Sequence, residues 1–162
     1  MKLKHSLTLD LASRIVDQAL STGRAHGFLP LSVVVLDAGG RIVASKSEDG
    51  SGIMRHDVAL GKAWGALGMG ISSRQIRDRL AARPTFVTAL STVSQGRLVP
   101  VPGGVLIEDE DGATIGAVGI SGDTSEKDEF RAIAGILAAG LRSDPDEPDP
   151  DWASSRLSDT EE

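Results

Sequence analysis

Apolar and polar residues follow two different periods in the first third of the chain. Residues 7–25 repeat apolar side chains every three to four positions, which predicts an amphipathic helix with Thr8 as its N-cap. Residues 31–36 are almost entirely apolar and predict a buried strand. A turn rich in glycine at 37–40 and a second strand at 41–46 follow, so the pattern predicts a β-hairpin.

Two helices are predicted in the middle of the chain, and the first of them is unusually rich in small residues. Residues 53–68 contain three glycines among alanines, although each glycine costs about 1 kcal/mol relative to alanine in a helix. We therefore expect another backbone or a ligand to approach this helix closely. The basic helix at 73–82 is expected to end before Pro84, and residues 86–92 to form an irregular or strand segment.

A second hairpin and a last helix complete the predicted order of elements. Residues 99–107 and 113–120 are apolar on either side of an acidic turn, and a helix is expected after the polar turn at 121–126. Asp123 and Asp128 are expected to cap this helix and to complement its dipole. Two hairpins separated by helices predict an α/β protein with an antiparallel sheet between helices, and they argue against a dinucleotide-binding fold.

The last twenty residues differ from the rest in charge and composition. Residues 143–162 contain eight acids and one base, so the net charge of −6 for the whole chain leaves +1 for residues 1–142. This segment also holds three of the seven prolines. We therefore predict one domain at 1–142 and a disordered or loosely docked tail at 143–162. The tail is interpreted either as a solubilising segment or as an arm that docks through Trp152.

Composition excludes several classes of function. Cysteine is absent, which excludes disulfides, thiolate nucleophiles and iron–sulfur clusters. No apolar run is long enough for a membrane span, and no secretory signal pattern opens the chain, so a cytoplasmic protein is expected. Aromatic residues make up only 3% of the chain, which argues against a nucleic-acid partner because the stacking platforms are missing.

Several motifs resemble those of one known family. The stretches VVVLDAGGRIVA, DVALGKAWGA and GRLVPVPGGVLIEDEDGATIGAVGISGDTSEKDE resemble the GlcG/HbpS family, also called DUF336 or the haem-degrading-domain family, over nearly all of residues 7–142. The resemblance implies a profilin-like sandwich with a central antiparallel sheet of about five strands, and assembly as a homo-oligomer, either a dimer or a larger ring. Some members of the family bind haem, which makes haem the expected cofactor here.

The resemblance directs attention to the residues that could ligate haem iron. Without Cys or Tyr, the available donors are three histidines and two methionines: His5, His26, His56, Met54 and Met69. His26 follows the first helix, where a cation complements the helix dipole, so a structural role is expected. His56 begins the glycine-rich helix and is the candidate axial ligand.

Other candidate residues would bind an anionic ligand. Lys62, at the typical K-A position of the family, and Arg83 could hold a carboxylate, with Phe86 beside it. The turn of Pro102, Gly103 and Gly104 could present backbone N–H groups to an oxyanion, and Ser121 could donate to the same ligand.

Two functions follow from these candidates. In the first, the protein binds haem or a related tetrapyrrole, which is the preferred interpretation. In the second, it is a cofactor-independent enzyme, an isomerase, lyase or hydrolase of a small organic acid. In that case His56 would be the general acid or base, and Lys62 and Arg83 would hold the carboxylate.

Overall fold

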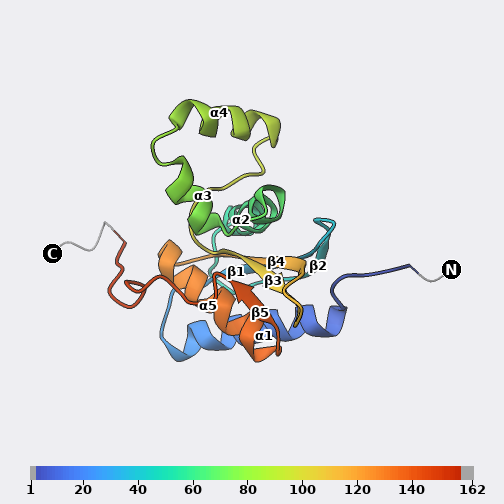
Figure 1. Ribbon diagram of the computed structural model, residues 1–162. Coiled ribbons are helices and arrows are strands. Elements are labelled where there is room, and N and C mark those ends of the chain that lie inside the picture. The colour runs from blue at the N-terminus through green and yellow to red at the C-terminus, as the bar shows by residue number, and fades with distance from the viewer. Residues whose placement is uncertain (1–2, 158–162) are drawn as a thin grey trace.

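The computed structural model describes residues 3–157, which form five helices and five strands (Figure 1). In chain order the elements are α1 (Leu9–Ala25), β1 (Ser32–Asp37), β2 (Ile42–Ser47), α2 (Arg55–Met69), α3 (Ser73–Leu80), α4 (Pro84–Val93), β3 (Gly104–Glu108), β4 (Thr114–Ser121), α5 (Ser125–Ala138) and β5 (Arg142–Asp144). Within the described residues, no helix is long and apolar enough to cross a membrane.

The strands form one antiparallel sheet with the order β2-β1-β4-β3-β5. Helices α1 and α5 cover one face of the sheet, and α2 covers the other (Figure 1). This arrangement confirms the α/β sandwich with a five-stranded antiparallel sheet that the sequence predicts. Helix α4 lies outside the sandwich, beyond α2 and α3.

The continuous apolar run of β1 is explained by burial on both faces of the sheet. Val33 and Val35 belong to the core shared with α1 and α5, whereas Val34 and Leu36 belong to the core beneath α2. Because successive side chains of a strand point to opposite faces, a strand between two helical layers has no solvent-facing side and needs no polar positions.

Helix α2 lies so close to the sheet that only small residues fit between them. A Cβ atom at Gly119 of β4 would collide with the carbonyl oxygen of Ala59. On another face of the helix, a Cβ atom at Gly61 would lie 2.6 Å from Val99. The close backbone approach predicted from the glycine-rich sequence is therefore confirmed, and the approaching groups belong to the same chain.

The prediction for residues 86–92 is wrong, because they belong to helix α4. Pro84 occupies its first turn, where the fixed φ of proline and its missing N–H suit a helix start. The proline therefore begins a new helix after α3 has already ended at Leu80. None of the residues of α4 is buried, so the β-branched and aromatic side chains that suggested a strand do not pack into the sheet.

The C-terminal segment begins with a short strand and then runs over two helices. Residues Arg142–Asp144 form β5 on the edge of β3, and the following residues run across α3 and α5. The ring of Trp152 stacks on Phe130 of α5, with 3.8 Å between centroids and 5° between planes. Residues 143–157 therefore lie against the rest of the protein, and the domain boundary at 142 with a disordered or loosely docked tail stays a prediction. Residues 158–162 of the predicted tail lie outside the described part.

Candidate functional site

The centre of the candidate site is a buried group of charged side chains between α2 and α5. Lys62 is only 2% exposed, and its Nζ lies 3.1 Å from Oδ2 of Asp128. The other carboxylate oxygen of Asp128 accepts a hydrogen bond from the Arg131 guanidinium and one from the Asp123 N–H at 3.1 Å. Burial lowers the pKa of Lys62, and the adjacent Asp128 carboxylate opposes that shift.

Asp128 therefore has a larger role than the capping role expected from the sequence. Its carboxylate lies between two buried cations, and its Oδ2 also accepts from the Gly122 N–H at 3.3 Å. Arg131 is fully buried and also donates to the carbonyl oxygen of Leu29. The sequence signal for this triad was the i, i+3 spacing of Asp128 and Arg131 on one helix face, which the prediction did not use.

The Pro102-Gly103-Gly104 turn lies directly against this charged group. Gly103 has φ +113°, and a Cβ atom there would lie 3.0 Å from Nζ of Lys62 and 2.9 Å from the carbonyl oxygen of Ile120. The Gly104 N–H donates to the hydroxyl of Ser73 at 2.7 Å, so this amide is already paired within the chain. The glycines allow the turn, α2 and β4 to meet, and the structure brings Lys62, Gly103 and Gly104 together as the sequence proposed.

Ser121 connects the buried group to the start of α2. It is 1% exposed at the end of β4, and its hydroxyl accepts a hydrogen bond from Arg55 at 3.3 Å. Arg55 was not singled out in the sequence, where nothing distinguishes it from the other arginines. Through this contact the end of β4 holds the first turn of α2, from which His56 projects.

His56 is partly exposed beside two strongly exposed apolar side chains. The imidazole is 36% exposed, and its Nδ1 lies 3.6 Å from Oδ1 of Asp57. Ile53 is 97% exposed and Met54 70% exposed. No side chain caps the N-terminus of α2, and although the Arg55 N–H donates to the carbonyl oxygen of Gly52 at 2.9 Å, the N–H groups of His56 and Asp57 in the first turn could face an anion. One short segment thus presents an apolar surface, an imidazole and helix N–H groups.

Arg83 and Phe86 lie elsewhere, at the start of α4. The Arg83 guanidinium lies 4.6 Å from the centre of the Phe86 ring, a cation–π contact on the surface. Lys62 is enclosed and paired, whereas Arg83 belongs to a helix outside the sandwich (Figure 1). The structure does not bring these two cations together around one pocket.

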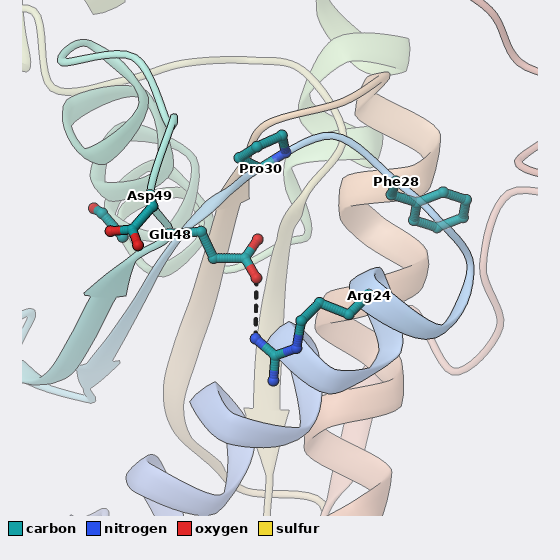
Figure 2. Close-up of a pocket in the computed structure, with 6 residues that line it drawn as sticks. Arg24, Phe28, Pro30, Glu48 and Asp49 are labelled. Atoms are coloured by element: carbon teal, nitrogen blue, oxygen red, sulfur yellow. Dashed lines mark hydrogen bonds and ion pairs between the residues drawn. The ribbon is translucent and has the colours of Figure 1, made fainter.

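The surface cavities of the described residues are open and of mixed character. The cavity in Figure 2 measures about 490 Å³ and is lined by Arg24, Phe28, Pro30 and the acidic pair Glu48 and Asp49. Arg24 and Glu48 pair across it at 3.1 Å and neutralise each other. Met69, another haem-ligand candidate, lines an apolar cavity of about 140 Å³ between α2 and α4, which is smaller than typical ligand pockets of about 300–1,000 Å³.

Metal-ion ligands of other kinds are absent from the described residues. No group of three or more His, Asp or Glu side chains gathers where it could hold a metal ion in the described part.

Comparison with protein families decides the family. The model of the family described as "Haem degrading protein HbpS-like" matches residues 7–137. The chain belongs to the HbpS-like family. The match spans all five helices and the first four strands, and it ends before β5 and the C-terminal segment.

A curated relative and solved structures agree with the HbpS-like assignment. An uncharacterised 15.0 kDa protein from the dhaT-dhaS intergenic region of Citrobacter freundii is 30% identical over 128 residues, 78% of this chain and 87% of the relative. A double mutant of Streptomyces reticuli HbpS superimposes with a TM-score of 0.71 at 28% identity, over 85% of this chain and 88% of that structure. A PduOC–haem complex superimposes with a TM-score of 0.76 at 24% identity, over 85% and 98%, and shares the fold.

Proposed function

We propose that this protein binds haem or a related tetrapyrrole and that the His56 imidazole would hold its iron. The observation that carries the proposal is the partly exposed imidazole of His56 beside the exposed side chains of Ile53 and Met54. A tetrapyrrole needs an apolar surface for its ring and a nitrogen or sulfur donor for its iron. The HbpS-like family and the haem complex of a protein with the same fold support the proposal.

The residues around His56 fit the other chemical groups of haem. The carboxylate of Asp57 lies 3.6 Å from Nδ1, beyond hydrogen-bond distance, and Nε2 on the other side of the ring is the nitrogen that would be offered to the iron. The uncapped first turn of α2 and the Arg55 guanidinium would attract a propionate group. A bound haem would supply an iron centre for redox chemistry or for a further ligand, while the protein binds, orients and partly shields it.

In this proposal the buried residues position the first turn of α2. Ser121 holds Arg55, and Gly103 and Gly104 allow Lys62 and Asp128 to pack behind the helix. Arg83 and Phe86 would contact the ligand only if it reached α4. The enzyme interpretation is less well supported, because it requires Lys62 and Arg83 to bind one carboxylate.

Haem titration followed by absorbance tests this proposal. Wild-type protein should give a saturable shift of the Soret band at one haem per chain or per dimer. His56→Ala should lose that shift, whereas His26→Ala is the matched control and should retain it. A weak change that does not saturate and is equal in all three proteins would contradict haem binding. Loss of the shift in His26→Ala alone would contradict the assignment of His56.

Assembly as a homo-oligomer is a separate part of the proposal. Helix α4 exposes apolar side chains outside the sandwich, among them Val93 at 80% exposure. Since an exposed apolar helix is stabilised when a second copy covers it, we expect α4 to lie in a contact between copies of this chain.

A further inference from the structure

We propose that residues 145–157 form a strap that opens and closes over α3 and α5, and that protonation of Glu129 favours the closed position. This strap lies outside the region matched by the HbpS-like family. It would regulate access to the surface beneath it, and it is independent of the haem proposal.

The strap is held by ring contacts of Trp152 and by hydrogen bonds to α3 and α5. Trp152 stacks on Phe130, and the Ser155 and Thr124 hydroxyls are 2.6 Å apart at the start of α5. From α3, the Arg74 guanidinium donates to the carbonyl oxygen of Glu147 at 2.9 Å. Opening the strap would break this stack, the edge contacts of Trp152 with His26 and Phe28, and the hydrogen bonds that the strap makes to α3 and α5, and it would leave the sheet intact. A segment held in this way opens more easily than the core does.

Glu129 lies beneath the strap at the point where it crosses α5. The side chain is fully buried, and its Oε1 accepts a hydrogen bond from the Asp149 N–H at 3.0 Å. Its Oε2 accepts no hydrogen bond from the described residues and lies 3.3 Å from Nε of Arg74. A buried carboxylate oxygen with so few donors is poorly solvated when it is ionised.

The charges that face Glu129 come from two elements. Arg74 and Arg77 of α3 and the hydrogen bond from the Asp149 N–H favour the ionised form, whereas the Asp149 carboxylate of the strap opposes it more weakly than that hydrogen bond supports it. Burial is the largest effect, and it raises the pKa of Glu129 from 4.5 to about 7. Opening the strap gives up the hydrogen bond from the Asp149 N–H, but it admits water to the carboxylate and relieves the larger effect of burial, so the ionised carboxylate favours the open position. The strap should therefore loosen as the pH rises through 7.

Opening the strap would change the surface around the Pro102 turn. A cavity of about 380 Å³ lies there, lined by Pro102, Thr124 and Glu126 together with Arg156 and Leu157 of the strap. The strap thus forms one side of this cavity, and Phe130 loses its stacking partner when Trp152 leaves. The closed position covers a concave surface that the open position would present to solvent.

Hydrogen–deuterium exchange of the full chain tests the proposal. Protection of residues 145–157 is measured at pH 6.0 and 8.5 relative to a synthetic peptide of the same sequence in the same buffers. With a closed-state pKa of about 7 and an open-state pKa near 4.5, protection should fall about tenfold between the two pH values. Protection of β1 should stay constant, which separates opening of the strap from global unfolding.

Matched variants identify the group that titrates. Glu129→Gln keeps an acceptor for the Asp149 N–H and should abolish the pH dependence, whereas Glu126→Gln on the same helix should retain it. The ring centre of His26 lies 5.8 Å from that of Trp152, so this imidazole is the second group to test. His26→Gln should retain the tenfold change. Trp152→Ala should show low protection at both pH values.

Three results would overturn the proposal. These are equal protection of the wild-type strap at both pH values, an unchanged pH dependence in Glu129→Gln, and wild-type protection in Trp152→Ala. If circular dichroism shows that Glu129→Gln does not fold, wild type and His26→Gln decide the question. A tenfold change that disappears in His26→Gln would then assign the titration to the histidine and reject Glu129.

Discussion

Replacing Asp128 by asparagine should destabilise the fold far more than replacing Lys62 by methionine. Asp128 is the only anion of a triad whose other members, Lys62 and Arg131, are cations. All three side chains are no more than 2% exposed. Asp128→Asn leaves two unpaired positive charges in the interior, whereas Lys62→Met leaves one ion pair.

The magnitudes follow from what each variant leaves unpaired. Removing one partner of a buried ion pair costs about 3–5 kcal/mol, and Asp128→Asn should reach the upper part of this range because two cations lose their partner. In Lys62→Met, the carboxylate keeps Arg131 and the N–H groups of Gly122 and Asp123. The variant loses the charged hydrogen bond between Lys62 and Asp128, but it also no longer has to bury the lysine ammonium group. The free energy of unfolding should therefore fall by only about 1 kcal/mol.

Urea denaturation followed by far-ultraviolet circular dichroism measures both variants against wild type. The free energies of unfolding are comparable when the dependence on denaturant is the same in all three proteins. A loss in Lys62→Met equal to or larger than that in Asp128→Asn would refute the argument that Asp128 is the centre of the triad. The haem titration supplies a second readout, because a purely structural Lys62 should leave the affinity of the folded Lys62→Met protein unchanged.

Two further predictions concern packing and assembly. Gly119→Ala should lower the free energy of unfolding by more than about 3 kcal/mol or prevent folding, because its Cβ atom would collide with a backbone oxygen of α2. Gly68→Ala, at an exposed position of α2, should instead raise the free energy of unfolding by up to about 1 kcal/mol. Thermal melts that rank the two variants the other way would contradict the close packing of α2 on the sheet. Val93→Glu should reduce the molar mass measured by light scattering after size-exclusion chromatography without lowering the melting temperature, and an unchanged mass would reject α4 as a contact between copies.

The order of elements was predictable because each of the main elements has a strong local pattern. The apolar runs of β1, β3 and β4 and the glycine turns between hairpin strands define the central sheet in sequence as well as in space. Helix α4 was missed because its residues gain no burial, so its composition carries no helical period. Strand β5 was missed because it is three residues long and lies in a strongly acidic stretch.

The structure brings together only some of the candidate residues that the sequence proposed, and Arg83 and Phe86 lie apart from them at the start of α4. The sequence proposed Lys62, Gly103, Gly104 and Ser121, and these residues do gather between α2, β4 and the Pro102 turn. The pairing of Lys62 with Asp128 was not predicted, since the two residues are 66 positions apart and no local pattern connects them. Long-range pairing of charges is decided by how the layers pack, which local sequence does not encode.

The short strand β5 has a consequence for the behaviour of the protein in solution. It pairs with β3 at the edge of the sheet, and Pro145 follows it directly, with no N–H to offer to another strand. Without β5, the backbone of the apolar strand β3 would be open to pairing with strands of other molecules. A chain ending before residue 142 should therefore aggregate during expression or heating even though its family domain is nearly complete.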